Sequence, residues 1–427
     1  MNEIPEGYLV EARRGIRCVV LRLFSMLLLL PMAVMAQTDR ATPYIPPNAG
    51  VVLQRVPPTT DPRVRAFDLL RADFDRHPQD SAKAVALAKA YVNYGRSTGD
   101  ARFLGRAMAV IDPFMKQTAP PIPVLLMHAT IQQSRHFFEA SRQELAHILN
   151  LDPDSGQAWL TLATVAMVQG DVDLANKACV QLTNNAGDFM GIVCSASLRS
   201  LTGHGKQAYA LLTMVEDPGP KAPPEIKSWI QGLMADVAVR MGKPELAERH
   251  FKQALQLTPE DNFLLADYGD FLLEQHRPQE VIVLIGNNTQ SDTSFLRLVL
   301  AEQMLGLPRA DKDADEMSAR FQAMDERGSH VFRREQAGFV LQVQRDPKRA
   351  LALATQNWTV QRAPKDVLVY LQAALAAHDP AAAKPVLDFL ARTHLDDVRI
   401  QPLVDQLTAA DMAVQTAATA AATESAR

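Results

Sequence analysis

The stretch GKPELAERHFKQALQLTPED, residues 242–261, decides the fold class of this chain. Ala247 precedes Phe251 by four residues and Ala254 by seven, so the three side chains fall on one face of a helix. A glycine and a proline before this helix, and a proline after it, mark its ends. Two small residues around a large ring let a neighbouring helix approach closely. Because a lone helix cannot bury such a face, the sequence predicts a partner helix that packs there.

The same pattern recurs along the chain at a spacing of about 34 residues. Counted from the first residue of each unit, small residues favour positions 8 and 20, and larger apolar residues favour positions 4, 7, 11 and 24. The units start at residues 122, 156, 189, 228, 262, 331 and 364. An insertion, PGPKAPPE, lengthens the step from 189 to 228. A degenerate unit with a long, charged second helix fills residues 294–330.

These units resemble the tetratricopeptide repeat (TPR), a helix-turn-helix module. The unit that starts at Gly156 carries the pattern in Trp159, Ala163, Gly170 and Ala175. The resemblance implies an all-α fold, a right-handed α-solenoid in which each helix pair packs on the next and stacking buries a continuous core. The low aromatic content of 6% and the scarcity of alternating β-branched runs also favour an all-helical chain.

The chain divides into five regions. Residues 1–36 read as a signal peptide, because arginines precede the apolar run 23–36, which is short for a membrane span and ends in small residues. We expect cleavage after Ala36 and hence an exported, periplasmic protein; a retained membrane anchor is the alternative. Residues 37–61 form a Pro-rich arm. Residues 62–121 form a divergent helical region, with helices at about 62–77, 80–96 and 101–117. Residues 122–397 form an array of about eight TPR units. Residues 398–427 form a closing helix and a disordered Ala-rich tail.

A closer resemblance comes from four segments taken in order. They are GRSTGDARFLG, LLMHATIQQSRHFFEA, LTGHGKQAYALL and DPKRALALATQNWTVQRAP. Together they look like a group of exported bacterial TPR proteins of unassigned function. The resemblance implies that some members are encoded near metal-permease-like membrane proteins, and it brings no activity with it.

Charge and cysteine content limit the classes of partner. Without the leader the net charge is −5, so no basic excess is available to neutralise phosphates, and nucleic acid is not expected as a partner. Two cysteines, Cys179 and Cys194, remain after cleavage, and they lack the spacing of metal ligands or of a redox motif. They are either a disulfide between adjacent helices or two small buried side chains.

The sequence carries no motif of catalysis or cofactor binding. HExxH, CxxC, GxSxG, phosphate-loop and GxGxxG patterns do not occur. His128, His136 and His147 fall within one repeat, but no second ligand three or four residues away supports a metal site. We therefore expect no enzyme activity, no cofactor and no bound metal.

Binding residues are expected on the first helix of each repeat, whose positions 2, 5, 9, 12 and 13 usually line the concave surface of this fold. The candidate groove residues are Gln157, Thr164, Trp229, Asp236, Arg240, Phe263, Asp270, Glu274 and Glu335. Trp229 and Phe263 would be apolar anchors, or would instead pack under the next repeat. The acids would provide selectivity; acid–base catalysis is the alternative. No set of lysines matches the family's clamp for peptide C-termini.

The sequence thus favours a non-catalytic periplasmic scaffold that binds a protein or peptide segment of the cell envelope. Membrane contact would come only through a partner or an uncleaved leader. One alternative is an accessory protein of a membrane transport system, which could be a metal-ion system. Another is a solenoid that binds small molecules or carbohydrate.

Overall fold

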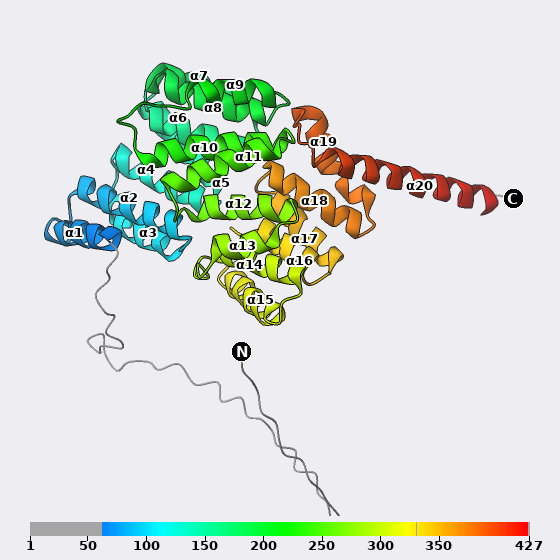
Figure 1. Ribbon diagram of the computed structural model, residues 1–427. Helices are drawn as coiled ribbons and strands as arrows, with labels where there is room; N and C mark the ends of the chain where they lie inside the picture. Colours follow the sequence, from blue (N-terminus) through cyan, green and yellow to red (C-terminus); the bar gives the residue numbers. More distant parts are fainter. Residues whose placement is uncertain (1–61, 330, 426–427) are drawn as a thin grey trace, which may run out of the picture. The chain divides into compact units, whose positions relative to one another are not determined.

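The computed structural model describes residues 62–425, apart from residue 330. The predicted signal peptide and Pro-rich arm lie outside the described residues. The described part contains helices and no strand (Figure 1), which confirms the predicted all-α solenoid. Within it, no helix is both long and apolar enough to cross a membrane.

Three helices, α1 (Pro62–Arg76), α2 (Ser81–Thr98) and α3 (Arg102–Met115), precede the array. Eight helix pairs follow: α4 (Ile122–Ser134) with α5 (Phe138–Leu151), α6 (Gly156–Gln169) with α7 (Val172–Ala186), α8 (Asp188–Ser200) with α9 (Gly205–Met214), α10 (Pro224–Arg240) with α11 (Pro244–Leu257), α12 (Asn262–Glu274) with α13 (Pro278–Ile285), α14 (Asp292–Leu305) with α15 (Ala310–Glu326), α16 (Arg333–Gln342) with α17 (Pro347–Trp358), and α18 (Pro364–Ala376) with α19 (Lys384–Thr393). A 3₁₀ turn, η1 (Pro380–Ala383), leads into α19, and α20 (Gln401–Ser425) ends the chain.

The alanine–phenylalanine–alanine face of α11 is buried as predicted. Ala247, Phe251 and Ala254 are almost completely inaccessible to solvent. The Phe251 ring lies 5.3 Å from the Tyr268 ring and 5.7 Å from the Phe271 ring, both on α12. The Phe251 ring therefore contacts the first helix of the next repeat, while α11 also packs closely on α10, the first helix of its own repeat.

Local sequence signals begin and end these helices. Side chains of Asp80, Asp171 and Asp261 accept backbone N–H groups at the starts of α2, α7 and α12. Prolines occupy the first turn of many of the other helices, where their missing N–H costs no hydrogen bond. Because caps and prolines recur at repeat boundaries, the helix starts fall within a few residues of the predicted unit starts.

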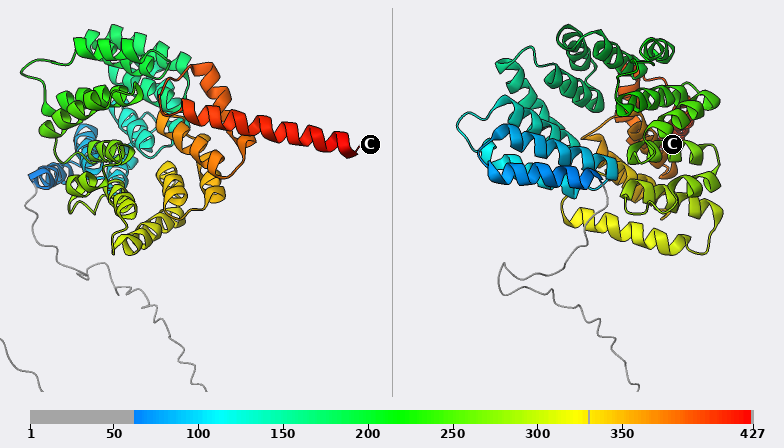
Figure 2. Two further views of the ribbon diagram at one scale, coloured as in Figure 1. Left: turned by 45° about the vertical axis from the view of Figure 1, so that its right-hand side comes forward. Right: turned by 60° about the vertical axis from the view of Figure 1, so that its left-hand side comes forward.

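The array closes on itself, so that its early turns contact its late repeats (Figures 1 and 2). The Asn262 amide donates to the Ser97 carbonyl at 2.5 Å, and helix α12 contacts α2. Further on, the Arg362 N–H donates to the Val168 carbonyl at 2.7 Å, and the Val398 N–H donates to the Arg240 carbonyl at 3.1 Å. We call this set of contacts the closing seam. It joins Ser97, Val168–Gly170, Gly203 and Arg240 to Asn262, Arg362, Phe389, His394 and Val398.

Two glycines allow the seam to close tightly. Gly170 ends α6 at φ +72°, and a Cβ there would lie 2.5 Å from Cε2 of Phe389. Gly203 has φ +77°, and a Cβ there would lie 2.7 Å from the carbonyl oxygen of His394. Both positions need glycine for their left-handed backbone and for the close approach of the later repeat.

The predicted closing helix corresponds to α20, which extends to Ser425. The disorder expected for the tail AAATESAR stays a prediction. Alanine has the highest helix propensity, which accounts for the continuation. Leu407 anchors the start of α20 because it is buried against α18 and η1, while the rest of the helix extends away from the array (Figure 2).

Candidate partner-binding site

The two predicted aromatic anchors are accessible. Trp229 on α10 is 38% exposed and Phe263 on α12 is 57% exposed, so part of each side chain is open to solvent. Gln157 at the start of α6 is exposed, and Thr164 on the same helix is half-buried. These four residues lie on the first helices of their repeats, as the repeat register predicts.

Asp270 is engaged within the chain. Its carboxylate accepts two hydrogen bonds from Arg297, at 2.7 and 2.8 Å, and one from Lys365 at 2.7 Å. Lys365 also donates to Asp267 at 2.7 Å. Burial alone would raise the pKa of Asp270, but the two cations outweigh it and hold that pKa below its ordinary value. The carboxylate is therefore a permanently charged link between α12, α14 and the start of α18.

Glu335 is also paired internally, with Arg334, at the start of α16. Burial opposes the charge on Glu335, while Arg334 and Arg297 lower its pKa below the ordinary value. His136, in the turn between α4 and α5, is influenced electrostatically by both residues of the pair. Its burial lowers the pKa of the imidazole to about 4, so His136 is neutral near pH 7.

The segment between α19 and α20 contacts another part of the predicted groove. Arg399 donates two hydrogen bonds to Glu274, at 2.8 and 3.0 Å, and binds Asp397 as well. The Arg240 side chain is only 4% exposed and contacts Asp236 and the Ser200 hydroxyl, each at 2.9 Å. Asp236 itself is 47% exposed.

These contacts correct the prediction of one open groove. Arg240, Asp270 and Glu335 are held in internal ion pairs. Those of Arg240 and Glu335 are local, whereas Asp270 is bound by Arg297 of the next repeat and by Lys365 of α18. Trp229, Phe263, Asp236, Glu274 and Gln157 keep exposed surface. Since Asp270 is tied to two cations, its contacts do not support the acid–base alternative.

A cleft that sequence reasoning missed opens where the first helices meet the middle and late repeats. It has a volume of about 1280 Å³. We call it the aromatic cleft; its apolar lining consists of Tyr94, Phe103, Leu265, Leu284, Ile285, Met324 and Phe332. Ser97 and Asn262, which are hydrogen-bonded to each other across the seam, also line it.

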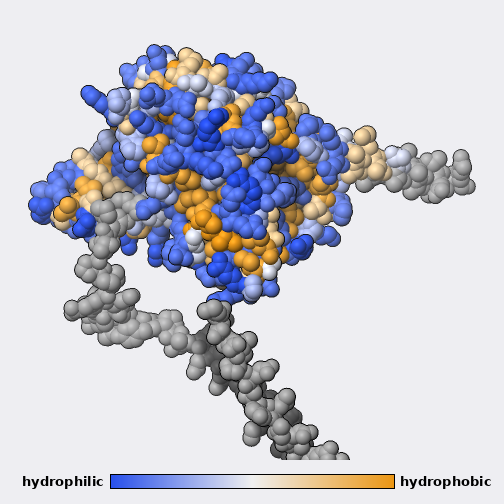
Figure 3. All heavy atoms as spheres, viewed as in Figure 1, coloured by the Kyte–Doolittle hydropathy of each residue, from blue (hydrophilic) through white to orange (hydrophobic). Residues whose placement is uncertain are grey.

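The wall contributed by the N-terminal region is built of aromatic rings packed on one another. The rings of Tyr94 and Phe103 lie 4.6 Å apart edge to face, and Phe67 on α1 packs on both, at 5.3 and 5.7 Å. Such packing holds the aromatic side chains in place before any partner binds. Near the opposite wall, hydrophobic residues gather over α12 and α13 on the face seen in Figure 3. Val283 there is 83% exposed, beside Leu284 of the cleft.

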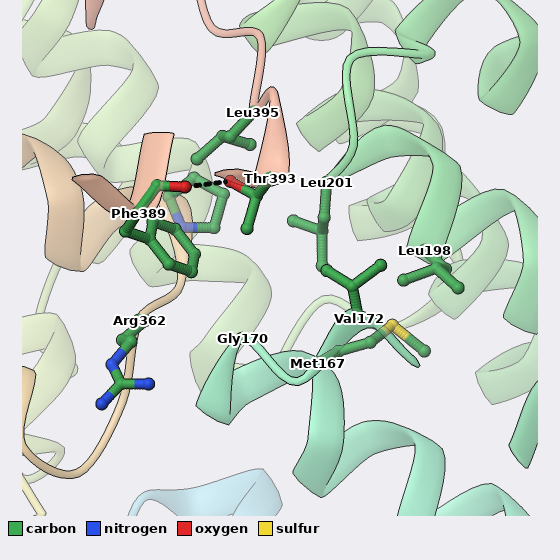
Figure 4. A pocket seen from close by; sticks show the side chains of 10 residues that line it. Met167, Gly170, Val172, Leu198, Leu201, Arg362, Phe389, Thr393 and Leu395 are labelled. Carbon is green, nitrogen blue, oxygen red and sulfur yellow. Dashed lines mark hydrogen bonds between the residues drawn. The ribbon is translucent and has the colours of Figure 1, made fainter. Parts of the chain in front are cut away.

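A second, apolar pocket lies in the closing seam (Figure 4). Its walls include Met167, Val172, Leu201, Phe389 and Leu395. Its volume of about 20 Å³ is close to that of one water-sized sphere, so it is a packing void and not a ligand site. The Thr393 hydroxyl, at its edge, donates to the Phe389 carbonyl at 2.9 Å.

The histidines and cysteines singled out in the sequence lie in separate places. His128 on α4 contacts Glu144 on α5 at 2.7 Å, whereas His136 is in the intervening turn. In the described part of the chain, no three His, Cys, Asp or Glu residues gather where they could hold a metal. A disulfide joins Cys179 on α7 to Cys194 on α8.

The fold and its register define an α-solenoid built of tetratricopeptide-type repeats. No family model matches the chain, and no curated protein matches it. Similar solved structures include the one titled "Functional Characterization of Pseudomonas Aeruginosa pilF", with 17% identity and a TM-score of 0.34 over 51% of this chain and 97% of that one. The structure of PilW, a "widely conserved type IV pilus biogenesis factor", has 12% identity and a TM-score of 0.32 over 66% of this chain and 98% of that one.

A third similar structure is the "APC/C hetero-tetramer Cut9-Hcn1", with 12% identity and a TM-score of 0.39. The match covers 81% of this chain and 52% of the other chain, so it extends over about half the length of that protein. The repeat assignment rests on the helix register and the buried positions of this chain, not on these similarities.

Proposed function

We propose that this protein is a non-catalytic scaffold of the periplasm that binds a segment of another envelope protein. The observation that supports the proposal most directly is the aromatic cleft, a preformed apolar site with a polar rim. Aromatic and large aliphatic side chains in such sites tend to dominate binding energy, and surrounding polar groups add selectivity. The periplasmic location rests on the predicted signal peptide, residues 1–36.

The rim of the cleft indicates what kind of segment it binds. Asp100 and Arg102 neutralise each other in a two-pronged ion pair, and Asp292 is paired with Arg320. Because these charges are already balanced, the cleft favours an apolar side chain of the partner over a strongly charged one. Phe263 and Val283, near the cleft, would extend the contact with that segment.

Photo-crosslinking in native cells tests this function. A photoreactive residue is placed at Arg327 or Gln290, which line the cleft and are exposed. The matched control position is Lys252 on α11, which lies outside the cleft. We expect a discrete envelope protein to be captured from the cleft positions and not from Lys252.

A second variant makes the result specific to the cleft. Leu284→Arg places a charge on the apolar wall and should abolish capture, provided that circular dichroism shows an unchanged helix content. Equal capture from Lys252, or none from either cleft position, would contradict the proposed function. N-terminal sequencing of the exported protein tests the location separately, with Gln37 expected as the first residue.

A further inference from the structure

A second cleft, distinct from the aromatic cleft, lies along the closing seam beside the pocket of Figure 4. It has a volume of about 460 Å³ and is formed by α5, the turn between α6 and α7, the loop before α18, and α19. Three arginines converge on it from separate segments: Arg142, Arg362 and Arg392. We call it the arginine cleft. It exists only because the late repeats close onto the early ones.

The contacts of the three arginines leave donors for a ligand. Arg142 Nη1 contacts Asp171 Oδ2 at 2.9 Å, and its Nε lies 3.9 Å from Glu139 Oε2. Arg362 Nη1 donates to the Gln169 carbonyl at 3.1 Å. Arg392 lies over the Phe389 ring, 5.7 Å from its centre, and forms no ion pair within the described residues. A guanidinium carries five N–H donors, so each group keeps several of them unused. In Figure 4 the Arg362 guanidinium points away from the apolar lining.

The start of α7 adds to the same site. Asp171 caps this 15-residue helix by accepting the Leu174 N–H at 3.1 Å. The N–H groups of Val172 and Asp173, at the first turn, have no partner within the helix. The positive end of the helix therefore faces the same cleft as the arginines and favours an anion there.

The charge balance selects the kind of anion. Arg142 is paired with Asp171 and Glu139, so Arg362 and Arg392 face only Asp173 among the remaining carboxylates of the lining, which is an excess of one positive charge. One excess charge suits a monoanion, whereas the two carboxylates would repel a phosphate dianion. The planar fork of arginine also matches the two oxygens of a carboxylate.

We propose that the arginine cleft binds an acidic side chain, Asp or Glu, of an extended peptide. The carboxylate preference follows from the charges and donors of the cleft. The choice of a peptide rests on the proposed function, and on a cleft volume several times that of a free carboxylate ion. The site lies on α5, on turns and on α19, away from the inner-face positions of the first helices, and would give a scaffold a second point of attachment.

Fluorescence anisotropy with the purified chain, without the leader, tests the proposal. The probe is a fluorescein-labelled hexapeptide amide with a single glutamate among glutamines, and the control probe is the hexaglutamine amide with the same label. At low salt we expect the glutamate probe to bind and the glutamine probe not to bind. Binding should weaken as salt rises, because the rim of the cleft is open to solvent.

Three variants locate the binding. Arg392→Gln should weaken it about tenfold, as expected for a lost charge-assisted contact. Lys384→Gln removes the same charge from an exposed position of the same helix and should leave affinity within about twofold. Asp173→Asn removes a repelling charge and should tighten binding a few-fold, a gain that loss of folding cannot mimic.

Several outcomes would overturn the proposal: no binding of the glutamate probe, equal binding of both probes, or equal effects of Arg392→Gln and Lys384→Gln. If inorganic phosphate displaces the probe at a lower concentration than acetate does, the proposed preference of the cleft for a carboxylate is also wrong. This experiment uses purified components, so its failure leaves the crosslinking test of the aromatic cleft untouched. Conversely, failed crosslinking would not change the anisotropy result.

Discussion

Replacing Gly170 by alanine should open the closing seam. Two costs add at this position. An alanine in the left-handed region costs about 1 kcal/mol. Its Cβ would also stand 2.5 Å and 3.1 Å from two ring carbons of Phe389. That ring is buried and lies 5.2 Å from the Trp358 ring, so it has little room to move, and overpacking of this kind costs about 2 kcal/mol.

Hydrogen exchange measures this loss where it occurs. The Arg362 N–H bonds to the Val168 carbonyl across the seam, so its exchange reports local opening. Opening of the seam relieves only the clash, because Gly170 keeps its left-handed backbone at the end of α6, so the about 2 kcal/mol of overpacking corresponds to roughly 30-fold faster exchange. Global unfolding is a weaker readout, because repeat arrays can open locally without unfolding as a whole.

Gly306→Ala is the matched control. Gly306 ends α14 at φ +60°, but a Cβ at this position would have no neighbouring atom within 4 Å. The substitution therefore carries the backbone cost without the clash, and exchange at Arg362 should stay unchanged. Phe389→Leu in the Gly170→Ala background should restore part of the protection. If Gly170→Ala leaves exchange at Arg362 as slow as in the parent chain, the reasoning about the seam is refuted.

Three further predictions follow from the internal contacts. Asp270→Asn leaves Arg297 and Lys365 without their carboxylate and should lower the free energy of unfolding, measured in urea, by about 3 kcal/mol. The control Asp388→Asn removes an exposed ion pair with Lys384 and should cost less than about 1 kcal/mol. Burial lowers the pKa of His136 to about 4 in the folded chain, whereas the histidine of the unfolded chain has a pKa near 6.5. The free energy of unfolding should therefore fall by at most about 3 kcal/mol between pH 6.5 and 4. Urea unfolding at several pH values measures this loss, and His136→Asn should flatten the profile. Reduction of Cys179–Cys194, which spans 15 residues, should cost about 3 kcal/mol, and a chain with both cysteines replaced by serine should be insensitive to reductant in the same assay.

The stability contributions of Asp270 and His136 have different pH windows. The pKa of Asp270 is lowered in the folded chain, so its contribution is present above the unfolded value of 3.8 and is lost only below it. The His136 contribution is complete above pH 6.5 and is lost earlier on acidification. A loss of stability confined to pH values below 4 would assign acid sensitivity to the carboxylates and contradict the role of His136.

Much of the fold could be predicted because the repeat pattern is local. The spacing of Ala247, Phe251 and Ala254 places them on one helix face, and recurrence at about 34 residues supplies the neighbour that covers it. Helices predicted at about 62–77, 80–96 and 101–117 lie at 62–76, 81–98 and 102–115. The disorder expected for the Ala-rich tail stays a prediction, because its polar and terminal residues favour fraying while its alanines favour a helix.

The candidate site was harder to predict, because it depends on residues far apart in sequence. Repeat register alone predicts Asp270 on the first helix of its repeat, and it lies on α12. It does not reveal that Lys365, 95 residues later, arrives to neutralise that carboxylate. The arginine cleft has the same origin, because Arg142 and Arg362 meet only after the array has closed.

The sequence by itself determined the helix pairs, their register and the small residues that let them stack, because these depend on neighbours within one or two repeats. Only the tertiary structure decided which inner-face residues remain open. That outcome depends on the small rotation between successive repeats, summed over the array, which sequence periodicity does not specify. The summed rotation brings the late repeats onto the early turns, and so closes part of the predicted groove while creating the aromatic and arginine clefts.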